Sequence, residues 1–223
     1  MGYAGGIKGL IFQKLINLIP PHEVYIESHL GLGTIMRKKR PAMRNIGIEI
    51  DAKVIKKWRE ENPLELELVH GAAISYLSSY VYSGKELVYC DPPYFLEKRK
   101  SHRKYYRYEY SVEQHAELLE VIKSLPCRVM ISGYESRLYK ESLKDWYTKK
   151  FQTATRHGEA TEWVWMNYSP PLELHDYRYL GDNFRERERI KKRAENWLSR
   201  LRSMPVLERQ SLLSAMRSVV NEG

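Results

Sequence analysis

Residues 86–94 read ELVYCDPPY, an apolar run that ends in a carboxylate, two prolines and a tyrosine. The apolar part predicts a buried strand, and the prolines fix φ in the turn that follows it. In this proline corner (Asp91–Tyr94), the Asp91 carboxylate and the Pro92 carbonyl can both accept hydrogen bonds from an exocyclic amine. The Tyr94 ring can stack on a flat ligand. The proline corner therefore suits a flat ring that carries an NH2 group, although an ordinary turn after a strand fits these four residues equally well.

Strand-like runs alternate with helical patterns along most of the chain. Ser111 and Gln114 form a capping box ahead of an apolar face, which predicts a helix there. Two later runs, 146–151 and 161–168, alternate in polarity and predict an antiparallel pair at one edge. The alternation predicts an α/β fold with a doubly wound, mostly parallel sheet and helices on both faces, in which ligands bind beyond the carboxyl ends of the strands. The parallel strands are expected at 24–27, 45–50, 66–70, 87–90 and 127–132.

The composition points to an anionic partner. The 223 residues include 37 basic and 28 acidic ones, which gives a net charge of +9. Nucleic acid is the commonest partner of such a protein, although a basic protein that is merely soluble has the same balance. The 43% apolar content excludes a disordered chain, and the length fits one α/β domain with additions.

Cysteine usage and hydropathy predict a cytoplasmic protein. Cys90 and Cys127 lie in apolar runs, which favours buried free thiols over a disulfide. Neither has a partner at metal-ligand spacing, so no metal site is expected. No apolar stretch is long enough to cross a bilayer. The first apolar run contains Lys8 and Lys14, which predicts an amphipathic helix rather than a secretory signal.

A glycine turn and an acidic strand end predict a nucleoside-type cofactor site. Gly31 and Gly33 follow the first expected strand, where glycine lets the backbone approach a ligand closely. Glu49 and Asp51 lie at the end of the second, where an acidic side chain typically binds ribose hydroxyls. Met36 stands where the longer fingerprint for a pyrophosphate requires its third glycine. A tight turn alone would also explain the two glycines.

In this order, the motifs resemble those of the Dam-type DNA adenine-N6 methyltransferases, which use S-adenosylmethionine. Residues 3–8 (YAGGIK) and 25–33 (YIESHLGLG) resemble the family's two cofactor motifs, and the proline corner matches its catalytic motif in full. Residues 132–134 (SGY) and 161–167 (TEWVWMN) resemble later core motifs. The resemblance covers nearly the whole core and implies a seven-stranded, Rossmann-like methyltransferase sheet.

The resemblance implies transfer of a methyl group from S-adenosylmethionine to the N6 amine of adenine in DNA, with S-adenosylhomocysteine as the second product and no metal. Asp91 and Pro92 would accept the two N–H bonds of the amine while Tyr94 stacks on the base. A target base within a duplex must be flipped out to reach them. The implied catalytic residues are Asp91, Pro92, Pro93 and Tyr94, and the implied cofactor-binding residues are Tyr3, Gly6, Lys8, Glu27, His29, Gly31, Gly33, Glu49, Asp51, Gly71, Ala72 and Asp91.

The sequence departs from the family pattern beside the cofactor. Residues 28–30 (SHL) replace Pro-Phe-Phe-like residues, and His29 is expected to form part of the pocket wall rather than to act as a base. Ala72 replaces the aspartate of a His-Gly-Asp motif that helps to hold the adenine part of the cofactor. The gap between Gly71 and Asp91 is too short for the separate recognition domain that some members carry there.

Two basic segments are candidates for DNA contact. Residues 98–110 (KRKSHRKYYRYEY) hold six Lys or Arg and four Tyr, although a solvated loop can have this composition. Residues 171–223 are predicted to form a helical extension of a catalytic domain at 1–170. Within it, 185–202 holds eight basic and three acidic residues, as expected either for an exposed helix or for one that follows the DNA backbone. The DNA-binding residues expected in the first segment are Lys98, Arg99, Lys100, Arg103, Lys104, Tyr105, Tyr106, Arg107 and Tyr108.

The expected partner is double-stranded DNA. The protein is expected to be a monomer, or a homodimer that pairs through a possible apolar stripe of Ile190, Trp197, Leu198 and Leu201 in the tail. Three alternatives stay open. The same corner can hold the N4 amine of cytosine, or adenine in RNA. The changes at residues 28–30 and at Ala72 would also fit a catalytically inert DNA-binding relative, against which the intact proline corner argues.

Overall fold

The computed structural model describes residues 8–61, 65–94, 107–155 and 158–221. The chain divides into two compact units, Met1–Tyr177 (unit 1) and Arg178–Gly223 (unit 2). Unit 1 holds the sheet and the proline corner, and unit 2 holds two helices.

Unit 1 is organised around one seven-stranded sheet in the order β3-β2-β1-β4-β5-β7-β6. The first five strands of this order are parallel, and β7 pairs antiparallel with both β5 and β6. The predicted mostly parallel α/β sheet is thereby confirmed. The strands are β1 (Val24–Glu27), β2 (Arg44–Glu49), β3 (Glu67–His70), β4 (Glu86–Cys90), β5 (Arg128–Gly133), β6 (Tyr147–Thr155) and β7 (Gly158–Met166).

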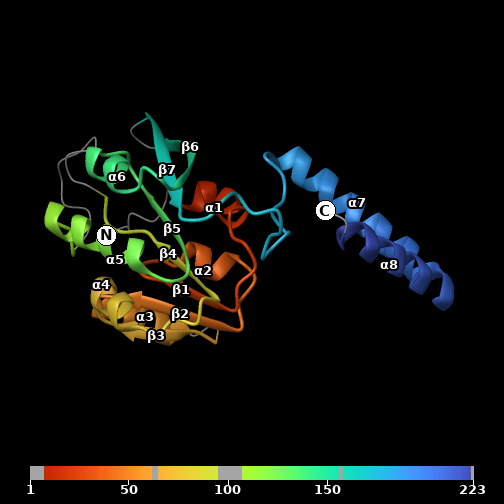
Figure 1. Cartoon of the computed structure of the whole chain (residues 1–223), viewed down its shortest axis with the longest axis horizontal. Coiled ribbons are helices and arrows are strands. Elements are labelled where there is room, and N and C mark those ends of the chain that lie inside the picture. Colours follow the sequence, from red (N-terminus) through yellow and green to blue (C-terminus); the bar gives the residue numbers. More distant parts are fainter. Residues whose placement is uncertain (1–7, 62–64, 95–106, 156–157, 222–223) are drawn as a thin grey trace. The chain divides into compact units, whose positions relative to one another are not determined.

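Helices cover both faces of the sheet. Figure 1 shows α4, α5 and α6 along one side, with α1 and α2 on the other. A core of buried aliphatic side chains fills the space between the sheet and the α4–α6 layer, including Ile26, Val88 and Leu119. The helices of unit 1 are α1 (Lys8–Ile16), α2 (Thr34–Lys38), α3 (Ala52–Glu61), α4 (Ala73–Ser79), α5 (Val112–Ser124) and α6 (Arg137–Ser142).

Local sequence explains several of these elements. Every residue of β4 is buried, as expected for a central parallel strand with helices on both faces. Helix α5 begins at the predicted capping box, because the Ser111 hydroxyl accepts from the Gln114 amide while the Gln114 side chain accepts from the Ser111 amide. Trp58 of α3 is buried and packs beneath the loop after β1. Local patterns therefore explain where these elements begin and which of their residues are buried.

The strand order reverses between β1 and β4. From β1 the chain moves to β2 and then β3 in one direction, and β4 and β5 then continue on the other side of β1. Glu27 pairs with Tyr89, and the Ser28 amide donates to the Tyr89 carbonyl at 3.0 Å. The loop after β1 and the proline corner after β4 therefore leave the sheet side by side. In open α/β sheets such a reversal is where ligands bind.

The expected strands are present with boundaries shifted by one residue or less at most ends. Three short helices, α2, α4 and α6, were not anticipated, because five to seven residues make too few turns to show an apolar period. Cys90 is buried and Cys127 is half-buried, and both are free thiols. Within the described ranges, every helix is too short or too polar to span a bilayer.

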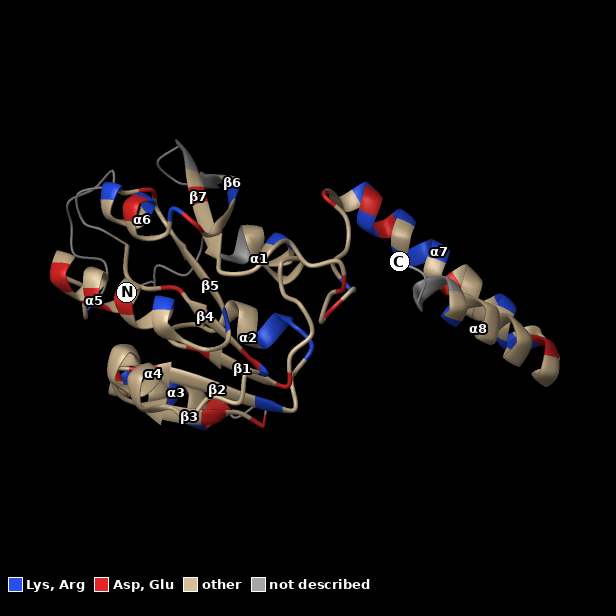
Figure 2. Ribbon diagram, viewed as in Figure 1, with Lys and Arg blue, Asp and Glu red and all other residues tan. Residues whose placement is uncertain are grey.

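Unit 2 consists of α7 (Phe184–Ser203) and α8 (Val206–Asn221). Asn183 caps α7 through its side chain, which accepts from the Glu186 amide at 3.0 Å. All of α7 is described and none of its residues is buried; the described side chains of α8 are not buried either. The final helix is sixteen residues long. Lys and Arg residues lie along much of α7 (Figure 2).

Candidate functional site

The proline corner presents one carboxylate beside a neighbouring strand. Asp91 is half-buried at the carboxyl end of β4. The Ser132 hydroxyl of β5 donates to its Oδ1 at 3.2 Å, and the Tyr89 hydroxyl lies 2.9 Å from the same Ser132 oxygen. Because Tyr89 and Ser132 are completely buried, the position of the Asp91 carboxylate is set from inside the sheet. A carboxylate offers about four acceptor sites in all.

Tyr94 is held by residues of the later strands. Its hydroxyl donates to Oε1 of Glu162 at 2.9 Å, and Glu162 lies on β7 with no exposed surface. Its ring lies 4.5 Å from the ring of Tyr134 at an interplanar angle of 56°. The turn between Asp91 and Tyr94 includes Pro92, which is buried. The orientation of the Tyr94 ring is therefore fixed by a hydrogen bond at one end and a ring contact at its side.

Two glycines in the loop after β1 have different surroundings. Both adopt positive φ, +48° at Gly31 and +58° at Gly33, a conformation that favours glycine. A Cβ on Gly33 would lie 2.3 Å from the Trp58 ring, so this glycine is needed for packing. A Cβ on Gly31 would meet no atom within 4 Å. The backbone at Gly31 therefore borders open space at the carboxyl edge of the sheet.

Glu49 is anchored by the backbone at both carboxylate oxygens. The Gly31 amide donates to Oε2 at 2.9 Å, and the Asp51 amide donates to Oε1 at 2.8 Å. Glu49 also lies next to Gly71, whose amide donates to the Glu49 carbonyl and whose Cβ position is open. A carboxylate has about four acceptor sites, so roughly two remain for ribose hydroxyls. This carboxylate thus fits the ribose-binding role predicted from its place at the end of β2.

Asp51 accepts a hydrogen bond from the backbone and forms an ion pair. It is buried at the start of α3, where its Oδ1 accepts from the Lys53 amide at 2.9 Å. The Arg107 guanidinium lies 3.5 Å from the same oxygen and is more than half exposed. Arg107 also lies near the Tyr108 ring, 5.6 Å from its centroid. Two residues predicted to contact DNA, Arg107 and Tyr108, therefore lie close to the predicted cofactor edge.

Glu27 lies beneath this edge rather than on it. Its side chain is 3% exposed, and its Oε2 accepts from the Tyr25 hydroxyl at 3.1 Å and from the Met36 amide at 2.9 Å. Burial raises the pKa of the Glu27 carboxyl to about 8, and the nearby Asp91 charge acts in the same direction. The Glu27 side chain therefore links the end of β1 to α2 through a hydrogen bond, and it is buried under the loop between them.

A buried lysine lies on the same side of the sheet. The Lys39 ammonium lies 4.0 Å from the centroid of the Tyr25 ring and donates to the Arg40 carbonyl at 3.0 Å. Burial lowers the pKa of Lys39 to about 7, against the opposing charge of Glu27. The chain end of unit 1 covers this region, because Asp176 accepts from the Arg40 amide at 2.8 Å.

His29 is part of a hydrogen-bonded wall. Its Nδ1 lies 2.8 Å from the Ser28 hydroxyl and its Nε2 lies 3.0 Å from the Tyr110 hydroxyl. Burial lowers the pKa of His29 to about 3, so the imidazole is neutral near pH 7. The Tyr110 ring in turn contacts the ring of the buried His115. Both ring nitrogens of His29 are engaged, which agrees with a wall position better than with a base.

The remaining predicted residues are only partly covered by the described ranges. Ala72 is exposed and occupies the N-cap position of α4, with no side-chain cap bond. Lys8 is the first residue of α1, and its side chain is not among the described ones. Outside the described residues lie Tyr3, Gly6, Lys98, Arg99, Lys100, Arg103, Lys104, Tyr105 and Tyr106.

The motifs at 132–134 and 161–167 contain two residues that position the site, but the sequence alone gave neither residue that role. Ser132 holds Asp91, and Glu162 holds Tyr94. A signal for the role of Glu162 was its charge within an alternating strand, because a buried carboxylate usually has a dedicated partner. In the described ranges, no three His, Cys, Asp or Glu side chains form a group that could hold a metal ion.

Residues 75–158 match the model of the D12 class N6 adenine-specific DNA methyltransferase family. The matched segment contains the whole proline corner. Over this segment the match confirms the resemblance to Dam-type methyltransferases that the motifs indicated. A comparison with curated proteins finds no match.

Several solved structures are similar to this chain at low sequence identity. A dimethyladenosine transferase from Plasmodium falciparum has 14% identity and a TM-score of 0.46; the match covers 71% of this chain and only 61% of the Plasmodium chain. An rRNA methylase from Streptococcus thermophilus has 10% identity and a TM-score of 0.46, over 70% of this chain and 94% of its own. A Streptococcus mutans methyltransferase in complex with SAH has 11% identity and a TM-score of 0.47, over 71% and 95%.

Proposed function

We propose that this protein transfers a methyl group from S-adenosylmethionine to the N6 amine of adenine in double-stranded DNA. The observation that carries the proposal is the Asp91 carboxylate, held by Ser132 at the carboxyl end of β4 where the strand order reverses. The family match over residues 75–158 supports the choice of an adenine amine as acceptor.

The carboxyl edge of the sheet has the features that a nucleoside-type cofactor requires. Glu49 is fixed by two backbone amides and keeps acceptor sites, and both Gly31 and Gly71 border open space. These three residues would hold the ribose end and allow close approach of the ligand. When bound, S-adenosylmethionine supplies an electrophilic methyl group on its sulfonium.

The proline corner activates and positions the acceptor. An adenine N6 lone pair is delocalised into the ring, so the nitrogen attacks poorly unless the pair is localised. Hydrogen bonds from its two N–H groups to the Asp91 carboxylate and the Pro92 carbonyl draw the nitrogen toward tetrahedral geometry. The N6 nitrogen would bond to the methyl carbon as S-adenosylhomocysteine leaves with the electrons of the carbon–sulfur bond, and it would then release to solvent a proton that the transfer makes acidic. The residues therefore act mainly through positioning and electrostatics, without a strong base. The neutral, doubly hydrogen-bonded His29 fits this scheme as part of the wall.

Tyr94 would orient the target base, which must first be flipped out of the duplex. Glu162 and Tyr134 hold the Tyr94 ring in place, so stacking on it costs little side-chain entropy. Extruding a base from a duplex costs a few kcal/mol, which contacts to phosphates must offset. Arg107 and Tyr108 are the described residues of the predicted DNA segment that can contribute.

The test is a methyl-transfer assay with S-adenosylmethionine labelled in its methyl group. Duplex DNA, single-stranded DNA and RNA of the same sequence are the acceptors, and digestion to nucleosides identifies the product. We expect N6-methyladenine in duplex DNA. Label in N4-methylcytosine or in RNA would assign the chain to those acceptors instead. No transfer together with no binding of S-adenosylmethionine by calorimetry would support the inert DNA-binding relative.

Sequencing of DNA from cells that express the chain, with detection of modified bases, then gives the position and sequence context of the methyl group. Cells that express Asp91→Asn are the control. Modified adenine that is equally abundant in both cultures would overturn the role given to this protein.

A further inference from the structure

Helix α7 of unit 2 carries a dense positive charge, whereas the proline corner belongs to unit 1. Residues 184–203 hold eight Lys or Arg and three Glu, which gives this one helix a net charge of +5 out of +9 for the whole chain. The hydrogen bonds that hold Asp91, Tyr94 and Glu49 come from residues of unit 1. A separate reason for this charge is therefore needed.

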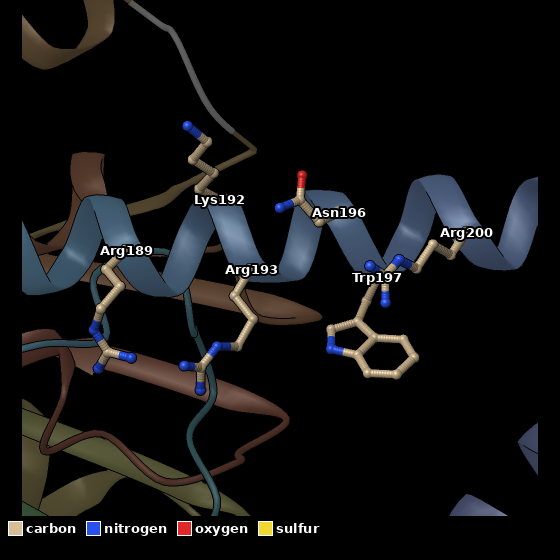
Figure 3. Close-up of a pocket in the computed structure, with 6 residues that line it drawn as sticks. All are labelled: Arg189, Lys192, Arg193, Asn196, Trp197 and Arg200. Carbon is tan, nitrogen blue, oxygen red and sulfur yellow. The ribbon is translucent and has the colours of Figure 1, made fainter.

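The charge is concentrated on one face. Six side chains line an open hollow of about 360 Å³ along α7. Successive residues in a helix turn by about 100°, so this spacing places all six within less than half of the circumference. Figure 3 shows Arg189, Arg193 and Trp197 extending from the same side of the helix. The residues of this basic face are Arg189, Lys192, Arg193, Asn196, Trp197 and Arg200.

Most basic side chains of this face have no acidic partner among the described residues. Arg189 lies 3.7 Å from Glu186. Among the residues that the structure describes, Lys192, Arg193 and Arg200 form no ion pair. Like charges three or four residues apart destabilise a helix by about 0.2–0.5 kcal/mol per pair, so this arrangement has a cost. An anionic partner along the face would offset that cost.

The length and chemistry of the face fit a phosphate backbone. From Arg189 to Arg200 the helix rises about 16 Å. A duplex carries one negative charge per about 1.7 Å of its axis, so several phosphates lie within this span. Asn196 adds an amide donor, a common phosphate contact, and Trp197 is half exposed at the rim. A second copy of this chain is a poorer occupant, because the whole chain is strongly positive.

We infer that the basic face of α7 binds the phosphate backbone of duplex DNA, without reading its sequence, as a contact separate from the methyl-transfer site. The choice of duplex DNA as the polyanion rests on the proposed function. The face adds affinity and not base choice, because contacts to phosphates carry no direct sequence information.

The test compares two charge-matched double variants in the full chain. Lys192→Gln with Arg200→Gln removes one Lys and one Arg from the basic face. Lys191→Gln with Arg202→Gln removes the same charges from the opposite side of α7, where neither residue lines the hollow. Arg200 and Arg202 both lie in the last turn, so effects on the helix dipole are matched. Gln is a good helix former, and circular dichroism checks that both variants keep their helix content.

Binding to a short labelled duplex is measured by fluorescence anisotropy from about 50 to about 300 mM NaCl. We expect the face variant to bind about tenfold or more weakly at low salt, with a slope of log K against log [salt] smaller by about 2. The control variant keeps the wild-type slope. Equal slopes in all three proteins would overturn the inference, and so would equal losses in both variants, which indicate total charge rather than a surface.

Methyl transfer by the wild type, measured in parallel, separates this inference from the proposed function. If the wild type methylates adenine in the duplex and both variants have the same salt slope, only the inference about α7 is overturned. Selective loss of duplex binding in the face variant, without transfer to DNA by the wild type, would support the contact and overturn the proposed function. If the face variant lost binding to an acidic protein such as serum albumin but kept wild-type binding to the duplex, this would count against DNA as the occupant.

Discussion

The proline corner of unit 1 and the basic face of unit 2 both present polar side chains to solvent, but they are built differently. Asp91 receives a hydrogen bond from Ser132, and Tyr94 donates one to Glu162; both partners have no exposed surface. On α7, no residue is buried, and Lys192 and Arg200 have no ion pair among the described residues. A buried partner fixes position, whereas an exposed helix supplies charge over an area.

The difference matches the two kinds of work proposed. Methyl transfer requires the acceptor amine to be held within a fraction of an ångström, which needs partners inside the sheet. Attraction of a phosphate backbone requires charge but little positional accuracy, because the counterion term depends on the number of contacts. Substitutions in unit 1 should therefore have large, specific effects, and those in unit 2 small and additive ones.

The largest expected effect is on Asp91. Asp91→Asn places an NH2 donor where an acceptor is needed, so methyl transfer should fall by about 10² to 10³-fold or more. Duplex affinity should stay near the wild-type value, because phosphate contacts dominate it. Initial rates of transfer and anisotropy give the two quantities. Asp145→Asn, at an exposed site, is the control and should have normal rates. A normal rate in Asp91→Asn would remove the proline corner from the mechanism.

Core truncation tests the comparison directly. Leu119→Ala in α5 removes a completely buried side chain and should lower the free energy of unfolding by about 2–5 kcal/mol. Leu198→Ala in α7 removes a side chain that is 50% exposed and should cost about 0.5 kcal/mol or less. Urea titrations followed by circular dichroism give both values. Similar losses at the two sites would show that unit 2 is packed as tightly as unit 1 in solution.

The two glycines after β1 distinguish packing from conformation. Gly33→Ala should cost about 2–5 kcal/mol, because positive φ and the clash with the Trp58 ring add together. Gly31→Ala should cost only about 1–2 kcal/mol, since its Cβ meets no atom within 4 Å. Thermal and urea unfolding measure the difference. If both variants lose the same stability, Trp58 does not pack beneath Gly33 as described.

Glu27 makes stability depend on pH. Its folded-state pKa of about 8 lies above the ordinary value of 4.5, so the folded protein binds a proton that the unfolded chain releases between these values. This contribution to stability is present below about pH 4.5 and is lost as the pH rises through about 8. Within that window the free energy of unfolding should fall by up to about 1.4 kcal/mol per pH unit through this group.

Glu27→Gln removes the ionisation and should flatten the curve of unfolding free energy against pH between pH 5 and 8 relative to wild type. Histidines with lowered pKa values, such as His22 and His175, contribute an opposite slope at acid pH, and the difference between the two proteins cancels it. Glu117→Gln, at an exposed position of α5, should leave the curve unchanged. Parallel curves for wild type and Glu27→Gln would refute the raised pKa.

A small, stabilising effect is expected at Ala72. This residue is the N-cap of α4 and makes no cap bond, so Ala72→Asp and Ala72→Asn should each stabilise the protein by about 1 kcal/mol. If the aspartate of related enzymes also holds the cofactor, only the Asp variant should bind S-adenosylmethionine more tightly by calorimetry. Equal affinities in the two variants would restrict position 72 to helix capping.

Much of unit 1 could be predicted from local patterns. The apolar run at 86–90 needs no partner to be recognised as a strand, and the capping box at Ser111 marks the start of α5 within four residues of sequence. The proline corner was recognisable because proline and aspartate act on their own backbone. The short helices α2, α4 and α6 gave no such signal, since each makes about two turns or fewer.

The sequence by itself determined the order of strands and helices, the proline corner and the excess charge of the tail, because each depends on neighbours along the chain. Only the tertiary structure decided which side chains hold the site. Ser132 lies 41 residues from Asp91, Glu162 lies 68 from Tyr94, and Gly31 lies 18 from Glu49. Such pairs are set by which strands lie side by side and by burial, which no local periodicity records.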